Sequence, residues 1–294
     1  MPMLQQAVAL SIEEVLLATD FSVASEKAGA YAKALVRRFG SNLEIAHVFD
    51  PSVVTSYEEA IVPMTATDRK QIADENLQCF ARNLALDEIP TRLVSTEDHD
   101  VSSALLELAT DQHADLIVTG TESKTGLSRL ILGSTAKQLL RRASCPVLAV
   151  GPKAREPKAG ALMFKTILYA TDFSPEAMKA ATYAFTFAQE SGATLLCCCV
   201  VEEGDERSST TASAAEVGER LKRLIPKDAH EWCNPEVFVE YGNAANEILQ
   251  LAEEHDVDLI VLGARRASFW LNRVHGGLTP QLLAEAKCPV LTIS

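Results

Sequence analysis

The chain contains one module written twice within its 294 residues. The string Ala-Thr-Asp-Phe-Ser occurs at residues 18–22 and again, unchanged, at 170–174. Single residues continue this match at an offset of 152, and a second set matches at an offset of 143, ending with Cys-Pro-Val-Leu at 145–148 and 288–291. The two offsets make the first copy nine residues longer in its middle. The two copies are therefore expected to share one fold, and to differ in function only where their residues differ.

The repeat predicts two domains, residues 1–150 and 165–294, joined by a linker at 151–164. Two domains of about 150 residues are the usual organisation for a chain of this length. The stretch 151–160 is charged and contains two prolines and two glycines, a composition typical of exposed connections. Hydrophobic residues make up 47% of the chain, enough for each domain to bury a core.

Composition narrows the class of partner and the compartment. The net charge of −13 disfavours nucleic acid and anionic membranes, which need clustered Lys and Arg. No apolar stretch reaches the length of a membrane span and no secretion leader is visible, so we expect a cytoplasmic protein. The seven cysteines form no Cys-x-x-Cys pair, which favours buried free thiols over a metal site, with redox sensing as the lesser alternative.

Each copy alternates short apolar runs with longer helical patterns. Runs of Val, Ile and Leu without strict alternation are typical of strands buried on both faces of a parallel sheet. The predicted strands are 15–18, 43–49, 91–95, 116–119 and 147–150, then 166–170, 194–201, 237–241, 259–262 and 290–293. The predicted helices are 25–39, 98–112 and 134–142, then 176–190, 243–255 and 278–286. The pattern predicts two tandem doubly wound α/β domains, each a five-stranded parallel sheet with helices on both faces. Residues 50–67 are predicted as an extended loop and 204–215 as a mobile one.

An aspartate follows the first predicted strand of each copy, at Asp20 and Asp172. In a doubly wound sheet, ligands bind beyond the carboxyl ends of the strands where the strand order reverses, here the first and fourth strands. A carboxylate there can accept hydrogen bonds from a ribose hydroxyl or an adenine amino group, or it can cap the next helix. Because Ser22 and Ser174 are able to cap alone, the ligand-facing interpretation is favoured.

The fourth strand of the first copy is followed by a segment rich in small residues, 120–135. Ser134 and Thr135 would begin the next helix, and their backbone amides could bind an anion there. Hydroxyls and a positive charge that could reach phosphate oxygens come from Ser123, Lys124, Ser134 and Thr135. Glycine spacing alone is equally consistent with Gly120 and Gly133 serving tight turns, and no Walker A tripeptide occurs.

Taken together, these residues resemble the universal stress protein family in its tandem, two-domain form. The family motif is Gly, two residues, Gly, nine residues and Gly-Ser/Thr, which aligns with residues 120–134. His47-Val48 and Cys145-Pro146-Val147 are also typical of it, and the resemblance spans nearly the whole chain. It implies an adenine nucleotide alpha hydrolase-like fold and a site for ATP, alone or with Mg²⁺.

The resemblance also implies which residues form the site. Asp20 would bind adenine or ribose with Ala18 and Thr19 beside it, Val48 would contact the base, Thr119 and Gly120 would flank the sugar, and Gly133, Ser134 and Thr135 would hold the phosphates. The counterparts in the second copy are Ala170, Thr171, Asp172, Val200, Leu262, Gly263, Arg266, Gly276 and Gly277.

Departures from the motif are larger in the second copy. Ser123 replaces the second motif glycine in the first copy, a small change. In the second copy Arg266 replaces that glycine, where it would crowd the nucleotide or pair with its phosphates, and Gly277-Leu278 replace the two hydroxyl residues. We therefore expect the first copy to bind the nucleotide, and the second to bind weakly or not at all.

The favoured function is an ATP-binding stress-response regulatory protein. One alternative is a scaffold without nucleotide, in which the last strands, 147–150 and 290–293, pair the two domains or form a homodimer. Another is a slow ATPase or self-phosphorylating protein with Ser123, Ser134 or Thr135 as acceptor. Glu122 and His99 are the only nearby candidates for a general base, and neither recurs in the second copy, so no catalytic residue is assigned.

Overall fold

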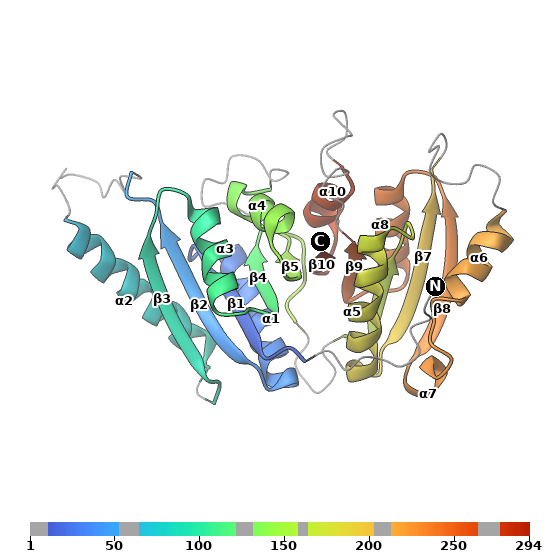
Figure 1. The fold of residues 1–294 in the computed structure, drawn as a ribbon, viewed down its shortest axis with the longest axis horizontal. Helices are drawn as coiled ribbons and strands as arrows, with labels where there is room; N and C mark the ends of the chain where they lie inside the picture. The colour runs from blue at the N-terminus through green and yellow to red at the C-terminus, as the bar shows by residue number, and fades with distance from the viewer. Residues whose placement is uncertain are drawn as a thin grey trace. The chain divides into compact units, whose positions relative to one another are not determined.

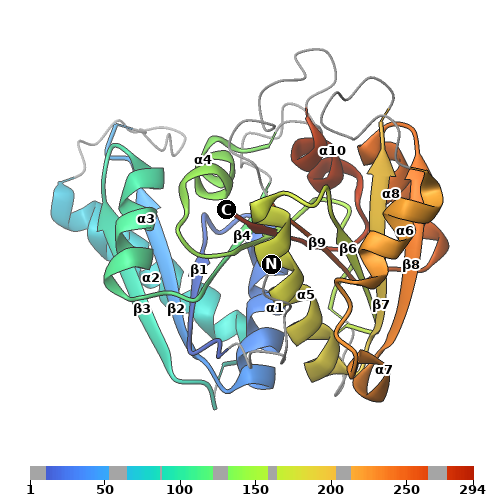
Figure 2. The ribbon, with the colours of Figure 1, turned by 45° about the vertical axis from the view of Figure 1, so that its right-hand side comes forward.

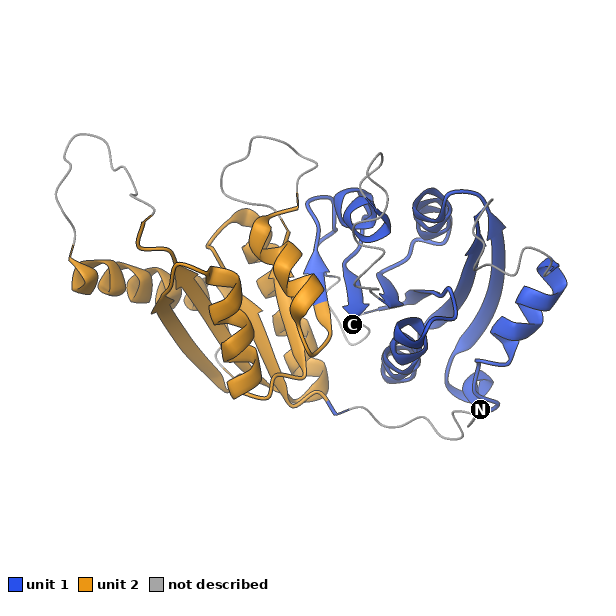
Figure 3. Ribbon diagram, turned by 45° about the horizontal axis from the view of Figure 1, so that its top comes forward, with its two compact units in different colours: residues 1–11, 148–294 blue, residues 12–147 orange. Residues whose placement is uncertain are grey.

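The structure is a computed structural model that describes residues 11–52, 65–86, 88–121, 132–157, 164–202, 213–263 and 277–294. It forms two compact units, an N-terminal unit of residues 12–147 and a C-terminal unit of the described residues from 148 to 294 together with Ser11, orange and blue in Figure 3. Strands and helices alternate in both units (Figures 1 and 2), which confirms the predicted α/β class and its tandem repetition. Most of the predicted loops 50–67 and 204–215 lies outside the described residues.

The N-terminal unit is a parallel sheet in the order β3-β2-β1-β4. Its strands are β1 (Glu14–Ala18), β2 (Asn42–Phe49), β3 (Thr91–Glu97) and β4 (Leu116–Gly120). Strand β5 (Val147–Val150) begins at the last residue of this unit and continues into the C-terminal unit. Helices α1 (Val23–Phe39) and α2 (Ala66–Leu84) cover one face, and α3 (Val101–Asp111) and α4 (Ser134–Arg142) cover the other (Figure 1). The chain leaves β1 toward β2 on one side and returns to β4 on the other, so the strand order reverses between β1 and β4.

The C-terminal unit repeats this arrangement in the order β8-β7-β6-β9-β10, with parallel pairing throughout the described ladder. Its strands are β6 (Thr166–Ala170), β7 (Thr194–Val201), β8 (Asn234–Tyr241), β9 (Leu259–Gly263) and β10 (Val290–Ile293). Its described helices are α5 (Pro175–Ser191), α6 (Ala214–Lys222), α7 (Ala229–Trp232), α8 (Ala244–Glu254) and α10 (Leu278–Glu285). The reversal therefore falls between β6 and β9, which are the counterparts of β1 and β4.

The central strands are buried on both faces, which explains their continuous apolar sequences. In β1, residues Val15, Leu16 and Leu17 are at most 1% exposed. Edge strand β8 is half-buried along most of its length. Gly40 and Gly192 end α1 and α5 with φ of 71° and 59°, as their C-cap position predicts.

The described part of the predicted linker, residues 151–157, packs onto the C-terminal unit. The Arg155 amide donates to the Lys287 carbonyl at 2.9 Å, and Ala154 is buried. A Cβ on Gly151 would lie 2.1 Å from the Leu283 carbonyl oxygen, so only glycine fits there. The charged residues of this stretch, by contrast, are exposed as the sequence predicts.

No helix among the described residues combines the length and the hydropathy needed to cross a bilayer.

Candidate functional site

The repeated pentapeptide forms a turn that is closed by its own side chains. In the N-terminal unit the Phe21 amide donates to Thr19 Oγ1 and the Ser22 amide to Asp20 Oδ1, both at 3.0 Å. The C-terminal unit repeats both bonds, from Phe173 to Thr171 Oγ1 at 3.0 Å and from Ser174 to Asp172 Oδ1 at 2.9 Å. Each copy thus uses one carboxylate oxygen to shape the turn, a structural role for the aspartate that requires no ligand.

The same turn places a phenylalanine in the left-handed region, with φ of 63° at Phe21 and 59° at Phe173. This conformation costs a residue with a Cβ about 1–2 kcal/mol. The helix that follows is capped by Ser22 or Ser174, whose hydroxyl accepts the amide three residues on. The cap prediction is confirmed, and the strained phenylalanine is a feature that the sequence pattern does not identify.

The ends of β1 and β4 lie side by side at the strand reversal. Ala18 pairs with Thr119 and, on its other side, with Ala46, and the Thr19 amide continues the ladder to the Ala46 carbonyl. Ala18, Thr19, Val48 and Thr119 are buried, whereas Asp20 is partly exposed. Asp20 therefore places a carboxylate at the carboxyl end of the central strands of this unit.

Packing requires glycine at positions 120 and 263. A Cβ on Gly120 would lie 2.7 Å from the carbonyl carbon of Ala24, in the first turn of α1. A Cβ on Gly263 would lie 2.3 Å from the Ala177 amide nitrogen, in the first turn of α5. In both units the fourth strand of the copy ends directly against the helix that the pentapeptide starts, so glycine is needed for close approach at these positions.

The start of α4 returns to the end of β4. The Gly133 amide donates to the Thr121 carbonyl at 3.0 Å, and α4 begins at Ser134, which is exposed, followed by the half-buried Thr135. The positive end of the α4 dipole thus lies at the same sheet edge as Asp20. Ser123 and Lys124 lie outside the described residues.

The corresponding helix start differs in the C-terminal unit. Gly277, the counterpart of Ser134, caps α10 with φ 66° and ψ 160°, a conformation that is open essentially to glycine alone. The helix therefore begins at Leu278, the counterpart of Thr135, one residue later than α4 does. Arg266 and Gly276 lie outside the described residues. Ala170, Thr171 and Leu262 are buried, Val200 is half-buried and Asp172 is exposed.

Different side chains support the turn in the two units. In the N-terminal unit the His47 ring lies 4.2 Å from the Phe21 ring, and Ser25 donates to Asp20. In the C-terminal unit the guanidinium of Arg220, from α6, lies 3.9 Å above the Phe173 ring. Sequence patterns do not single out Ser25 or Arg220, but a comparison of the copies could have found Ser25, because its counterpart is Ala177.

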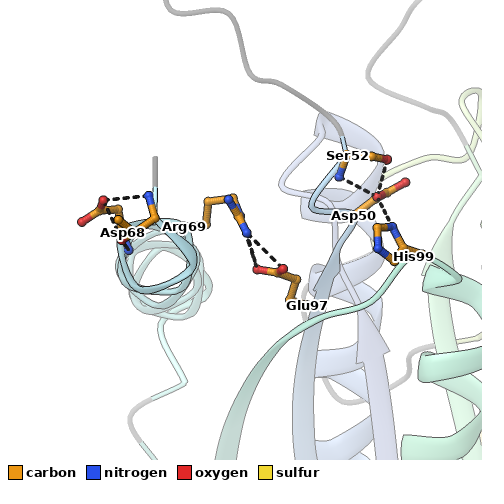
Figure 4. A network of polar contacts seen from close by, with 7 residues as sticks. Asp50, Ser52, Asp68, Arg69, Glu97 and His99 are labelled. Atoms are coloured by element: carbon orange, nitrogen blue, oxygen red, sulfur yellow. Dashed lines mark hydrogen bonds and ion pairs between the residues drawn. The ribbon is translucent and has the colours of Figure 1, made fainter. Parts of the chain in front are cut away.

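A separate polar network lies at the carboxyl ends of β2 and β3 (Figure 4). Asp50 Oδ1 accepts the Ser52 amide at 2.8 Å and the Ser52 hydroxyl at 2.6 Å, and these bonds hold the pKa of Asp50 below its usual value. His99 Nδ1 lies 3.2 Å from the same oxygen, and Arg69 pairs with Glu97 at 3.1 Å. His99, which the sequence offers as a candidate general base, thus lies exposed on the surface and pairs with Asp50.

All seven cysteines are free thiols, but the predicted burial holds only for Cys197, Cys198, Cys199 and Cys288, because Cys79 is exposed and Cys145 and Cys233 are half-buried. Burial raises the pKa of Cys197, Cys198 and Cys288 to about 12, so these thiols stay protonated and unreactive at neutral pH. Among the residues that the structure describes, no cluster of three or more His, Cys, Asp or Glu side chains is arranged to hold a metal ion.

Comparisons with known proteins point to one family for both copies of the module. A family model described as "Universal stress protein family" matches residues 11–151 and 163–294. A universal stress protein homologue from Staphylococcus aureus (strain USA300) is 30% identical over 144 residues, which cover 48% of this chain and 85% of that protein. The crystal structure of a universal stress protein from Archaeoglobus fulgidus DSM 4304 is similar with a TM-score of 0.71 and 19% identity, over 97% of this chain and 99% of that one. One from Pseudomonas aeruginosa UCBPP-PA14 has a TM-score of 0.63 and 15% identity, over 96% and 93% of the two chains.

Proposed function

This chain belongs to the universal stress protein family, and we propose that its N-terminal unit binds an adenine nucleotide, ATP or a close relative, as a stress-response regulator. Asp20 would receive hydrogen bonds from the ribose or the adenine, and the first turn of α4 would bind the phosphates. The C-terminal unit would bind the same nucleotide weakly or not at all.

The observation that carries the proposal is the meeting of two opposite charges at the strand reversal. The Ala18–Thr119 pairing puts the turn of Asp20 beside the end of β4, and the bond from Gly133 to Thr121 puts the start of α4 there too. A nucleotide has hydroxyl and amino donors at one end and an anion at the other. Its two ends therefore match a carboxylate and a helix N-terminus that lie at one sheet edge.

Differences in the backbone as well as in the side chains support the proposal that the C-terminal unit binds the nucleotide more weakly. Gly277 supplies no hydroxyl, and it has the positive-φ conformation described above, with α10 beginning one residue later than α4 does. The amide geometry that would receive phosphates is therefore different in the C-terminal unit, even though Asp172 keeps the same turn as Asp20.

The test compares Asp20→Asn with Asp172→Asn in the full chain. Asparagine retains an oxygen that can accept the Ser22 amide, so the turn is kept while the charge is lost. A hydrogen bond to a charged group contributes about 1.5–3 kcal/mol, so Asp20→Asn should weaken ATP binding about 10- to 100-fold. Asp172→Asn should change it by less than about twofold.

Binding is measured by isothermal titration calorimetry, and the wild-type protein is also denatured and its extract analysed for co-purified nucleotide. Equal losses in the two variants would show that the proposed asymmetry is wrong. A wild-type chain that carries no nucleotide and binds no added ATP would remove the proposal altogether.

A further inference from the structure

The carboxylate of Asp20 is held by a buried serine on the next helix. Ser25, 4% exposed in the first turn of α1, donates its hydroxyl to Asp20 Oδ1 at 2.6 Å. The Asp20 amide in turn donates to Ser25 Oγ at 3.2 Å. Because the serine bonds to both the backbone and the carboxylate of one residue, it restricts the side-chain rotation of Asp20.

The two residues that flank Asp20 are held by His47 of β2. Its Nδ1 lies 2.8 Å from the Thr19 carbonyl oxygen, and since a carbonyl only accepts, Nδ1 carries the proton and donates. Its ring lies 4.2 Å from the ring of Phe21, the residue in the left-handed conformation. His47 therefore stabilises the strained turn on both sides of the carboxylate.

The C-terminal unit has other residues at both supporting positions. Ala177 stands in place of Ser25 and Cys199 in place of His47, at the offset of 152 that relates the pentapeptides. An alanine side chain has no hydroxyl to offer Asp172, and a thiol is a weak donor. The bonds within the turn are nevertheless the same as in the N-terminal unit. The turn thus forms without these two side chains, and what Ser25 adds in the N-terminal unit is a second hydrogen bond to the same carboxylate oxygen of Asp20, donated from helix α1.

We propose that Ser25 and His47 are positioning residues of the nucleotide site, which fix the orientation in which Asp20 meets the ligand. The inference rests on the proposed function of the N-terminal unit, and it adds two residues outside the glycine motif of residues 120–134 that differ between the units. A carboxylate that is already oriented loses less side-chain freedom when the ligand binds, so its contact with the nucleotide is stronger.

Two substitutions in the full chain test the two supports. Ser25→Ala removes the hydroxyl, and the C-terminal unit shows that alanine is compatible with this turn. His47→Phe keeps a ring beside Phe21 but removes the donor to Thr19. Each change should weaken ATP binding about 3- to 10-fold by calorimetry, the equivalent of ordering one side chain.

Two further variants separate positioning from folding. Ser102→Ala removes a serine–aspartate bond of the same kind, to Asp100 Oδ1 at 2.7 Å, away from the turn, and should leave ATP affinity within about twofold of wild type. His47→Asn restores a nitrogen donor at the distance of Nδ1 and should recover most of the affinity that His47→Phe loses. The urea midpoint of each variant reports its effect on stability.

These measurements distinguish a failure of the positioning roles from a failure of the proposed nucleotide binding. If the wild-type chain binds ATP while Ser25→Ala and His47→Phe bind it equally well, the positioning roles are wrong and the nucleotide site stands. Equal weakening by His47→Phe and His47→Asn would overturn the role of the Thr19 hydrogen bond. If Ser102→Ala loses as much ATP affinity as Ser25→Ala does, the loss reflects general destabilisation of the fold, and the positioning role of Ser25 is wrong.

Discussion

Gly120 shows at the scale of one residue that a motif glycine can be required by packing. The Cβ of an alanine there would lie 2.7 Å from the Ala24 carbonyl carbon and 2.8 Å from its oxygen. These are backbone atoms of a capped helix turn, which cannot rotate away as a side chain does. The position therefore carries information about how α1 meets β4, whether or not a ligand is bound.

We expect Gly120→Ala to lower the free energy of unfolding by about 1–3 kcal/mol, the usual range for overpacking a filled interior. Gly29→Ala is the matched control, because its new Cβ would meet the end of the flexible Leu84 side chain, at 2.8 Å. Alanine in a helix interior also gains about 0.5–1 kcal/mol over glycine, so this variant should stay near wild type. Urea unfolding at equilibrium measures both. Equal destabilisation of the two variants would contradict the packing argument.

At the scale of an element, α3 depends on the hydrogen bonds of a single capping residue. Asp100 accepts the Ser103 amide at 3.1 Å, the Ser103 hydroxyl at 2.6 Å and the Ser102 hydroxyl at 2.7 Å. These bonds lower the pKa of Asp100 to about 2. The carboxylate is fully exposed, so the shift comes from hydrogen bonding to the charged form and not from burial.

The lowered pKa sets the direction of the pH dependence. The pKa of an aspartate in the unfolded chain is about 3.9. The cap therefore contributes its full stabilisation above that pH, and this contribution is lost as the pH falls toward 2. We expect Asp100 of the wild type to stay ionised between pH 5 and 3, and carbon NMR of the carboxyl groups measures its ionisation. In Ser103→Ala its pKa should rise toward the ordinary value. A wild-type Asp100 that titrates near 4 would show that the cap bonds do not form in solution.

The elements also show why only part of this structure follows from the sequence. The central strands are predictable because burial on both faces leaves only apolar residues, as in Val15–Leu16–Leu17. Helix α2 is not, because Ala73, Leu77 and Phe80 are its only buried residues and the rest of its 19 residues are partly or fully exposed. The position of Asp20 is predictable from the strand that precedes it. Its supports are not, because Ser25 and His47 meet it only when α1 and β2 pack against the turn.

At the scale of the whole molecule, the duplication provides an internal comparison. Both units have the same strand order about a reversal and the same closed turn after the first strand. They differ at the start of α4 compared with that of α10, and in the side chains that support the turn. Any global change in stability on adding ATP would act on both units, whereas binding at the proposed site would act on one.

Hydrogen exchange with and without ATP should therefore separate the two units. At a ligand concentration 100 times the dissociation constant, binding stabilises the folded site by about 2.7 kcal/mol, which slows exchange about 100-fold where opening of the site exposes the amides. We expect this slowing in β1, α1 and β4, and little change in β6, α5 and β9, their counterparts. Peptides from equivalent positions of the two copies lie in the same elements and have similar burial, so each serves as the other's control. Equal slowing in both units would mean that the later start of α10 and the loss of its hydroxyls do not prevent binding, and the asymmetry would have to be abandoned while nucleotide binding itself remained.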